Sequence, residues 1–496
     1  MQQIHLQSKM LINIANQDPD KIAVETQHQK ISYGDLYESI SSLVEWIKNN
    51  NINSLVLNCD NNIDWIVVDL ACQEAAVICV PVPLFYTENQ IQKLINSVQP
   101  DLILSDRSLP YDISDISDIE EMSHGLTLIS YRFKQKSNIE VPEFTSKITY
   151  TSGSTGEPKG VCLSTENQLQ VAYSLIDVIG LTSTKHLCLL PLATLLENIA
   201  GVYSPLLAGG TVVLATDSER GFEGSKLVDH KRLLNCISDV KPDSLILVPE
   251  LLQILIHAAK NGWPVPDSLK FVAVGGSVVS SELIKQAREL KLPVYQGYGL
   301  SECSSVVSLS TPANDTIEAA GSILPHLSAK VIDDELVVYG NTFLGYLEQP
   351  DTWGKSEVYT GDIVELCNSL VTVTGRKKNI IINSFGRNIS PEWVESKLLS
   401  SGILQQAVVI GDNKPFCIAI IVPASEKISL QLIEKMIDET NTSLPDYAQV
   451  KDFMVLDDPM QFENGLFTSN GRPRRTNIQN NYQQIINQKY LSAVTY

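Results

Sequence analysis

Apolar runs alternate with amphipathic stretches along residues 1–145 of the chain. The amphipathic stretches repeat their apolar residues at helical spacing, whereas the apolar runs have the length of buried strands. The predicted order is helix 32–47, strand 54–57, helix 64–74, strand 76–82, helix 90–98 and strand 101–105. Because helices that alternate with strands cover parallel sheets, this pattern predicts an α/β fold. Residues 106–143 are polar and acidic, and we expect an irregular surface segment there.

The alternation resumes after a segment rich in glycine and hydroxyl groups. The expected elements are strand, turn, helix and strand over 187–214, strands at 244–248, 271–274, 407–411 and 417–422, and a helix at 430–438. A chain of 496 residues is also too long for one ordinary domain. We therefore predict a large α/β N-terminal domain of helix-covered, mostly parallel sheets with a smaller β-rich part, and a small α+β C-terminal domain.

Residues 147–163 read KITYTSGSTGEPKGVCL and combine a flexible backbone with hydrogen-bond donors. The glycines can adopt backbone angles that other residues avoid, so successive N–H groups can converge on an anion. Hydroxyl groups and a lysine add further donors and a positive charge. The candidate phosphate ligands are Thr151, Ser152, Gly153, Ser154, Thr155, Gly156 and Lys159.

This stretch is not a P-loop, because that motif needs a lysine followed by serine or threonine at the start of a helix. Here Lys159 precedes Gly160 and an apolar run. The next helix signal is the capping-box spacing of Thr165 and Gln168. We therefore expect a loop between two strands to hold the phosphates. A solvated hairpin turn rich in serine and glycine is the alternative interpretation.

Composition narrows the classes of partner. The formal net charge of −20 disfavours nucleic acid and anionic membranes, which repel acidic surfaces. The nine cysteines form no C-x-x-C pair, and the seven histidines show no metal-ligand spacing. No apolar run approaches the roughly 20 residues that span a bilayer, and no signal-peptide pattern is visible. We expect a cytoplasmic protein without a transmembrane segment.

A second glycine-containing motif, YQGYGLSECSSV, covers residues 295–306. The ring of Tyr298 can stack on a purine, and Gly297 and Gly299 let the chain pass beside it. Glu302 offers carboxylate oxygens, which are the ligands that Mg²⁺ takes beside phosphates. A surface turn is the alternative interpretation of this motif.

These motifs, in this order, resemble those of the adenylate-forming enzyme superfamily of acyl-CoA synthetases, luciferases and nonribosomal peptide adenylation domains. The resemblance covers nearly the whole chain. SFGRNISPEW at 384–393 and Glu197 are more similar to long-chain fatty acyl-CoA synthetases than to peptide synthetase domains. The resemblance implies ATP and Mg²⁺ as cofactors, with Thr155 and Glu302 at the metal, and CoA or a carrier's phosphopantetheine as the thiol.

The resemblance also assigns the remaining nucleotide and substrate positions. The implied nucleotide-binding residues are Gly276, Ser277, Gln296, Gly297, Tyr298, Gly299, Ser301, Asp362 and Arg376. The implied acyl pocket comprises Thr194, Leu195, Ile199, Gly275 and Cys303. Thr194 stands where the family commonly has a histidine or an aromatic residue, so the pocket departs from the family pattern. For the apolar helix in 187–214, plain core packing is the alternative.

The resemblance places a hinge at 377–379, with Lys378 as its pivot, between an adenylation domain at 1–376 and a lid at 380–496. The implied thiol tunnel is shaped by Phe385, Gly386 and Arg387.

Arg472 stands where the family has a lysine that reaches the carboxylate and the α-phosphate. Arginine keeps the charge but differs in geometry. A solvated basic tail is the alternative for Arg472. The implied catalytic residues are Lys159, Glu302 and Arg472.

The leading hypothesis is an AMP-forming acid–thiol ligase of the acyl-CoA synthetase type. A medium- or long-chain fatty acid would attack the α-phosphorus of ATP, giving an acyl-adenylate and pyrophosphate, and the thiol of CoA would then displace AMP. A second hypothesis is an acyl-AMP ligase that loads the phosphopantetheine arm of an acyl carrier protein. A third, from another class, is a nucleotide-binding protein that has lost catalysis through Arg472. The sequence does not predict the oligomeric state.

Overall fold

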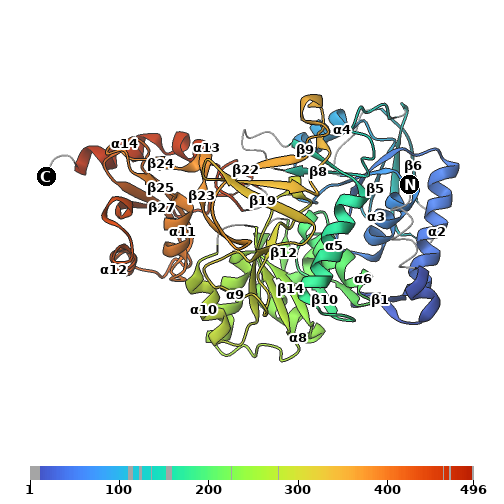
Figure 1. Cartoon of the computed structure of the whole chain (residues 1–496), viewed down its shortest axis with the longest axis horizontal. Helices are drawn as coiled ribbons and strands as arrows, with labels where there is room; N and C mark the ends of the chain where they lie inside the picture. The colour runs from blue at the N-terminus through green and yellow to red at the C-terminus, as the bar shows by residue number, and fades with distance from the viewer. Residues whose placement is uncertain are drawn as a thin grey trace.

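The computed structural model of the chain describes residues 12–109, 115–121, 126–135, 137–151, 159–224, 226–276, 279–461, 463–468 and 471–493. Two extended sheets form a large N-terminal region, and a three-stranded sheet forms a smaller C-terminal lobe. Figure 1 shows this lobe in orange and red at one end of the molecule, away from the blue N-terminal elements.

The largest sheet has thirteen strands in the order β19-β20-β22-β23-β18-β17-β16-β15-β14-β10-β11-β1-β2. Its parallel strands are β16 (Val294–Tyr298), β15 (Phe271–Val274), β14 (Ser244–Leu247), β10 (Lys185–Cys188), β11 (Thr211–Leu214) and β1 (Ile22–Glu25). Its antiparallel strands are β2 (Lys30–Ser32), β17 (Ser308–Leu309), β18 (Ser322–Ile323), β19 (Leu327–Ile332), β20 (Glu335–Gly340), β22 (Glu357–Cys367) and β23 (Leu370–Arg376). The run from β17 to β23 is the smaller β-rich part that the sequence predicts.

The second sheet has eight strands in the order β21-β9-β8-β4-β3-β5-β7-β6. These are β3 (Ser54–Asn58), β4 (Ile78–Pro81), β5 (Leu102–Ser105), β6 (Ile116–Glu121), β7 (Ile129–Phe133), β8 (Lys147–Thr151), β9 (Lys159–Leu163) and β21 (Gly345–Tyr346). The prediction of an irregular segment at 106–143 is wrong for β6 and β7, which pair antiparallel at the sheet edge. Edge strands need only one buried face, so their apolar signal is weak.

Helices cover both sheets and connect the strands. They are α2 (Tyr33–Asn49), α3 (Ile63–Ala75), α4 (Glu88–Val98), α5 (Thr165–Ile179), α6 (Ser204–Leu207), α7 (Asp217–Arg220), α8 (His230–Val240), α9 (Pro249–Lys260) and α10 (Ser281–Glu289). The short turns are η1 (Glu197–Tyr203), η2 (Ser301–Cys303), η3 (Pro350–Thr352) and η4 (Lys377–Asn379), and a small hairpin joins β12 (Phe222–Glu223) to β13 (Lys226–Leu227). Among the described helices, none combines the length and apolar composition of a membrane span.

Local sequence determines where several of these helices begin. Ser32 caps α2 by accepting from the Asp35 N–H, while the Asp35 side chain accepts from the Ser32 N–H. For α5 the cap is Ser164 with Asn167, so the predicted capping pair Thr165 and Gln168 is wrong by one residue. Asn167 takes the place of the usual glutamate or glutamine, so Ser164 and Asn167 do not match the usual sequence pattern of a capping box.

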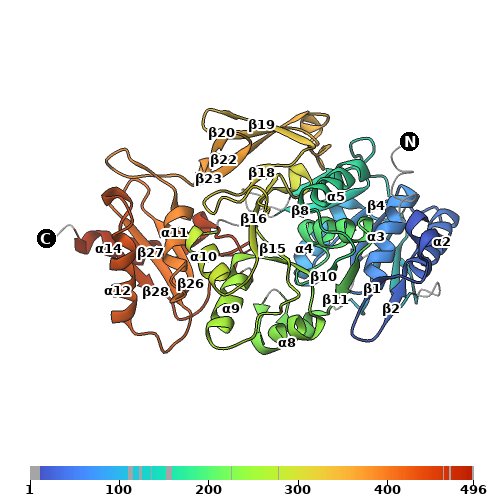
Figure 2. The same cartoon turned by 60° about the horizontal axis from the view of Figure 1, so that its bottom comes forward.

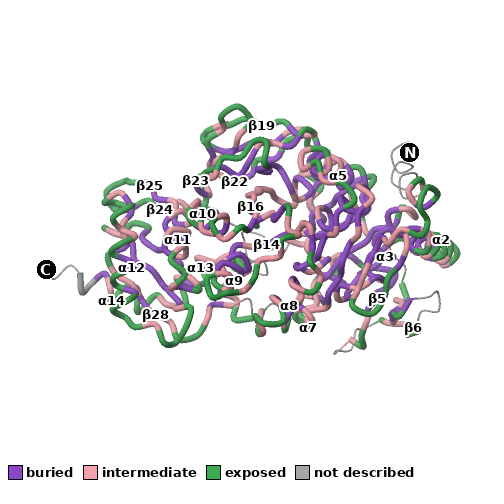
Figure 3. Tube along the Cα trace, turned by 90° about the horizontal axis from the view of Figure 1, so that it is seen from below, coloured by how far each residue is buried: buried purple, intermediate pink, exposed green. Residues whose placement is uncertain are grey.

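The hydrophobic core lies between the two sheets and the helices that separate them, as the buried trace in Figure 3 shows. Trp65 of α3 is fully buried there. Tyr33 is also buried, and its hydroxyl donates to the carbonyls of Leu206 and Gly210 at 2.9 and 2.8 Å. These contacts fix α2 and α6 beside the large sheet.

The C-terminal lobe is a small α+β unit with its own core (Figure 2). It comprises β24 (Ile381–Ile382), β25 (Asn388–Ile389), α11 (Pro391–Leu399), β26 (Leu404–Ile410), β27 (Cys417–Pro423), α12 (Leu430–Asn441), η5 (Asp446–Ala448), β28 (Val450–Val455), α13 (Arg475–Asn481) and α14 (Gln483–Ala493). The predicted fold class, a large α/β region with a β-rich part and a small α+β lobe, is confirmed. The chain passes from β23 through η4 into this lobe; the domain boundaries at 377–379 stay a prediction.

Candidate active site

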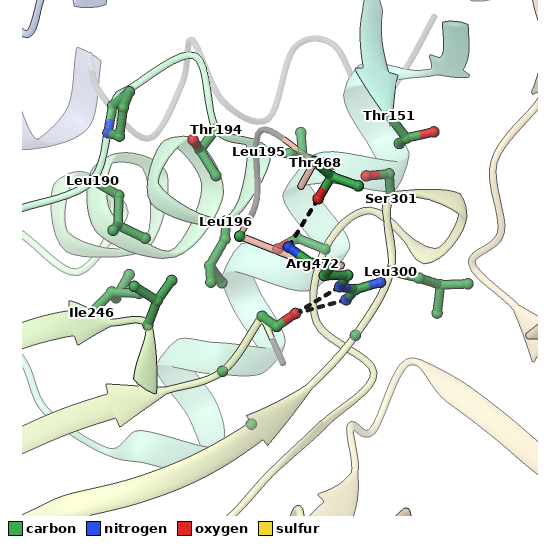
Figure 4. Close-up of a pocket in the computed structure, with 18 of the residues that line it drawn as sticks. Thr151, Leu190, Thr194, Leu195, Leu196, Ile246, Leu300, Ser301, Thr468 and Arg472 are labelled. Atoms are coloured by element: carbon green, nitrogen blue, oxygen red, sulfur yellow. Dashed lines mark hydrogen bonds between the residues drawn. The ribbon is translucent and has the colours of Figure 1, made fainter. Parts of the chain in front are cut away.

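A cavity of about 1760 Å³ lies between the large region and the C-terminal lobe. Its wall includes Val248, Gly275 and Gly299, which follow the carboxyl ends of β14, β15 and β16. Parallel α/β sheets bind ligands at this edge, because the strands deliver loops from one side. The lobe contributes Thr468 and Arg472 to the same cavity (Figure 4).

The predicted phosphate loop begins and ends at the cavity wall. Thr151 ends β8, Lys159 begins β9, and the two residues are antiparallel partners that line the cavity. The predicted phosphate-binding segment therefore connects two paired strands. The other predicted ligands in this loop, Ser152, Gly153, Ser154, Thr155 and Gly156, lie outside the described residues, as does Ser277.

Tyr346, which was not among the predicted site residues, connects Glu302 to the strands that flank the phosphate loop. The Tyr346 hydroxyl donates to Glu302 Oε1 at 2.7 Å, and Lys159 Nζ lies 4.8 Å from the centroid of the Tyr346 ring. Burial and the Glu302 carboxylate raise the pKa of Tyr346, so the phenol stays a donor. Tyr346 reaches this place because β21 pairs with β9, a long-range pairing that no local pattern reveals.

The Glu302 carboxylate fits the predicted Mg²⁺. It is an oxygen ligand on the wall of a cavity that also contains Lys159 and Ser301. Hard divalent cations take carboxylate oxygens and share them with phosphates. The second predicted ligand, Thr155, lies outside the described residues, so the fit rests on Glu302.

The predicted nucleotide residues converge at the strand ends of the large sheet. The Tyr298 hydroxyl donates to Asp362 Oδ2 at 2.8 Å, and Arg376 Nε lies 3.1 Å from Asp362 Oδ1. Burial raises the pKa of Asp362 and the Arg376 charge opposes this effect. Gly299 has no room for a side chain, since a Cβ would lie 1.6 Å from Ser305 O.

Not every predicted nucleotide residue faces the cavity. Gly276, Gly297, Tyr298, Gly299, Ser301 and Arg376 line it. Gln296 instead pairs with Val274 inside the sheet, and Asp362 lies behind Tyr298 and Arg376 without lining the cavity itself. A ribose would therefore reach Asp362 only by displacing one of these two partners.

Arg472 crosses from the lobe to the large region. Its Nη2 and Nε donate to the Gly276 carbonyl at 2.7 and 3.1 Å. The turn that presents it is closed by two bonds to Thr468, from Arg472 N to Thr468 Oγ1 at 3.0 Å and from Thr468 N to Arg472 O at 2.7 Å. Burial and the nearby Arg376 charge lower the pKa of Arg472. The guanidinium therefore lies at the end of β15, which excludes a freely solvated basic tail at this residue.

The predicted hinge residue lines the cavity, whereas the predicted thiol-tunnel residues do not. Lys378 lines the cavity, and burial together with the Arg376 and Arg472 charges lowers its pKa. Phe385 is 72% exposed, and neither it nor its neighbours Gly386 and Arg387 line the cavity. In this arrangement the lobe presents Arg472 to the cavity and holds the 384–390 loop away from it.

The structure places three of the five predicted acyl-pocket residues on the cavity wall. Thr194, Leu195 and Gly275 line the cavity, whereas Ile199 and Cys303 are fully buried in the core and do not. Helical spacing alone could not separate the wall from the core behind it. The aliphatic wall is completed by Leu190, Leu196 and Ile246, and Leu300 lines the cavity on the other side of Arg472 (Figure 4).

Comparisons with known proteins identify the family of the chain. A model of AMP-binding enzymes matches residues 12–347, and a model of the AMP-binding enzyme C-terminal domain matches residues 378–493. A 2-succinylbenzoate–CoA ligase of Staphylococcus epidermidis is 25% identical over 420 residues, 80% of this chain and 83% of the relative. A long-chain-fatty-acid–CoA ligase of Mycobacterium tuberculosis is 28% identical over 336 residues, 55% of this chain and 53% of the relative.

Two solved structures show the same fold. An anthranilate CoA ligase in complex with anthranoyl-AMP superposes with a TM-score of 0.79 at 16% identity, covering 96% of each chain. An o-succinylbenzoate CoA synthetase of Bacillus subtilis with ATP and a magnesium ion gives a TM-score of 0.72 at 22% identity, covering 91% of this chain and 96% of that one. The chain belongs to the AMP-binding enzyme family, as an AMP-forming acid–CoA ligase that uses ATP, Mg²⁺ and CoA.

Proposed function

We propose that the acid is an apolar monocarboxylate, a medium- or long-chain fatty acid. The observation that carries this proposal is the aliphatic wall beyond Gly276, formed by Leu190, Leu195, Leu196 and Ile246. Burial of methylene groups against such a wall makes binding of the acid more favourable, whereas removal of a charge from water against it makes binding less favourable.

The same wall distinguishes this acid from those named for two similar proteins. A succinylbenzoate carries a second carboxylate, which needs a cationic or hydrogen-bonding partner once it is removed from water. The side chains of Leu190, Leu196 and Ile246 provide neither. An alkyl chain asks for no such partner, so a fatty acid fits this part of the cavity better.

The polar half of the cavity suits the first half-reaction. In Figure 4, Arg472 has Thr151, Ser301 and Leu300 on one side and Leu190, Leu196 and Ile246 on the other. Its guanidinium would hold the acid carboxylate and the α-phosphate in line, and Lys159 would neutralise charge on the departing pyrophosphate. Mg²⁺ bound at Glu302 would supply further charge neutralisation on the phosphates. Because the residues only orient and stabilise charge, no protein nucleophile is required.

Thioester formation requires a second arrangement of the lobe. The 384–390 loop lies outside the cavity while Arg472 occupies it. Rotation about Lys378 would withdraw Arg472 and bring Phe385 towards the acyl-adenylate, as lids commonly do between reaction steps. The thiol would then attack the carbonyl carbon, and AMP would leave.

The test is ATP–pyrophosphate exchange over a panel of saturated fatty acids, aryl acids and a succinylbenzoate. Exchange with an optimum among the fatty acids supports the proposal, and a preference for aryl or dicarboxylic acids contradicts it. AMP release after addition of CoA or of a holo carrier protein then identifies the thiol acceptor. ATP binding without exchange for any acid would instead indicate a nucleotide-binding protein that has lost catalysis.

A further inference from the structure

The inner part of the cavity follows one face of the large sheet. Alternate residues of neighbouring strands share a face, and Phe271 and Ala273 of β15 line the cavity with Ser244 and Ile246 of β14. Ser244 and Phe271 are partners in the parallel pairing. At about 3.3 Å per residue, the distance along the strand from Phe271 to Gly276 is about 16 Å, the length of an alkyl chain of roughly a dozen carbons.

A chain of three polar side chains lies at this inner end. Ser244 Oγ is 2.9 Å from His186 Nδ1, and His186 Nε2 is 2.9 Å from Glu197 Oε1. The other carboxylate oxygen, Glu197 Oε2, accepts from the Leu190 N–H at 3.0 Å. Both Ser244 and His186 line the cavity. No local sequence pattern indicates a role for His186, because its partner Glu197 comes from η1 and Ser244 from another strand.

For a neutral His186 imidazole and an ionised Glu197, the arrangement determines the direction of these hydrogen bonds. A carboxylate can only accept, so His186 Nε2–H donates to Glu197. With a neutral imidazole, Nδ1 then accepts from the Ser244 hydroxyl. The Ser244 hydroxyl therefore donates its proton to His186, and its oxygen can only accept a hydrogen bond from a ligand in the cavity. A ligand at this point is recognised through a donor, such as an alcohol O–H.

The fold makes room for this pair deep in the molecule. The His186 side chain is 3% exposed and the Glu197 side chain 0%. A Cβ on Gly201 would lie 2.2 Å from Glu197 Oε1 and 2.7 Å from His186 Nε2, so the residue that faces the pair must lack a side chain. Gly201 and Glu197 belong to η1, a π-helical turn of the kind that often marks functional sites.

Two further residues with hydroxyl groups, Thr184 and Ser204, line the cavity, together with apolar residues such as Ile176 and Ile179. The cavity wall therefore combines aliphatic side chains with the hydroxyl groups of Thr184, Ser204 and Ser244.

We propose that Ser244, oriented by His186 and Glu197, is a subsite for a hydroxyl group carried near the far end of the acyl chain. The preferred substrate is then a hydroxylated fatty acid of roughly a dozen carbons, whose alcohol donates to Ser244 Oγ. This inference rests on the proposed function, because it concerns the acid that the same cavity activates. Glu197 and His186 act as positioning residues, since they contact the acid only through Ser244.

The test compares matched pairs of acids, each with and without a terminal hydroxyl, over a series of chain lengths. The readout is kcat/KM in ATP–pyrophosphate exchange. For the native enzyme we expect the hydroxylated member to be preferred about fivefold at the optimal length, the worth of one hydrogen bond. A terminal carbonyl, which has no proton to donate, should show no such preference.

Two variants separate recognition from structure. In Ser244→Ala the preference ratio should fall to about one, because the acceptor is lost. The matched control is Ser328→Ala, an exposed serine of β19 outside the cavity, which should keep the native ratio. An equal loss with both acids in Ser244→Ala would mean a structural role and would overturn the inference.

The outcomes also separate this inference from the function on which it rests. Activation of plain fatty acids without a preference for the hydroxylated partner would overturn the subsite and leave the ligase function standing. Absence of exchange with every acid would contradict the proposed function itself. Equal preference for terminal alcohol and terminal carbonyl would contradict the hydrogen-bond direction argued from Glu197 and His186.

Discussion

The hydrogen bonds from Arg472 to the Gly276 carbonyl hold a cation where the carboxylate and the α-phosphate would meet. We expect Arg472→Ala to lower ATP–pyrophosphate exchange on the order of a hundredfold, because preorganised charge stabilisation is lost. Thioester formation from supplied acyl-adenylate should change little, since the proposed rotation of the lobe would withdraw Arg472 from the cavity for that step. Arg472→Lys should recover part of the exchange because it restores the charge.

Arg232→Ala, an exposed arginine of α8, is the control for this pair of assays. It should leave both half-reactions near their native rates. Equal losses of the two half-reactions in Arg472→Ala would contradict a role confined to adenylation.

The burial of His326 leads us to expect that the stability of the protein depends on pH. Burial lowers the pKa of His326 from 6.5 to about 4, and its Nε2 is buried without a hydrogen-bond partner. Below pH 6.5 the unfolded chain therefore binds a proton that the folded chain excludes until about pH 4. The contribution of the neutral His326 ring to the free energy of unfolding is complete above pH 6.5. It is lost as the pH falls from 6.5 to about 4.

We therefore expect the thermal midpoint of the native enzyme to fall more between pH 7 and pH 5 than that of His326→Gln. The glutamine can still bond Ser174, which lies 2.7 Å from His326 Nδ1, but cannot titrate. Other carboxylates affect both proteins equally, so the difference between the two profiles is the measurement. Parallel profiles would show that His326 does not titrate in this range.

At the scale of single residues, the sequence predicts site residues that share a local motif. It does not predict those that only the folded chain brings together. Tyr298 and Glu302 could be found from a glycine-rich stretch of twelve letters, 295–306. Tyr346 and His186 could not, because their partners lie 44 and 11 residues away on other elements. Periodicity also gave no means of telling Ile199, in the core, from Leu196, in the wall.

At the scale of elements, a buried polar network joins β8, α3 and η1. Lys147 Nζ and Asp69 Oδ1 are 2.8 Å apart, and each side chain is 1% exposed. Tyr203 donates to Asp69 Oδ2 at 2.5 Å, and Asn198 donates to the same oxygen at 3.0 Å. Because β8 leads into the phosphate loop and η1 forms part of the acyl wall, this network fixes the two halves of the site relative to each other.

Breaking this network should be strongly destabilising. Lys147→Met leaves the Asp69 charge buried without its cation, and we expect a loss of about 3–5 kcal/mol in the free energy of unfolding. Lys147→Met combined with Asp69→Leu should lose less than the sum of the single variants, since neither charge then remains unpaired. Denaturant unfolding measures both effects, and additive losses would mean that the two charges do not interact.

Element types were predictable where caps and periodicity agree, as in α2, and not where they conflict. The π-helical turn Glu197–Tyr203 departs from the 3.6-residue period on which helix prediction depends. Its polar members Glu197, Asn198 and Tyr203 point inward to buried partners. A sequence pattern treats such residues as solvent-facing, so the network stays invisible until the elements are placed.

At the scale of the whole molecule, the order of motifs predicts the fold but not the position of the lobe. The contact between Arg472 and Gly276 joins residues 196 positions apart. Local sequence does not encode where the lobe lies relative to the large region, because η4 joins the two and that contact is made between distant residues. The structure shows the position in which Arg472 occupies the cavity and Phe385 is exposed.

A proline at the predicted pivot tests whether a second lobe position is needed. Lys378 lies in the 3₁₀ turn η4, whose φ values suit proline, but the ring prevents the other φ values that a rotation would require. We expect Lys378→Pro to keep ATP–pyrophosphate exchange and to lose CoA-dependent AMP release on the order of tenfold or more. Lys378→Ala is the matched control, because it removes the same charge while leaving the backbone free. Should both variants slow the two half-reactions alike, the lobe would need no rotation about this residue, and one arrangement would have to serve both steps.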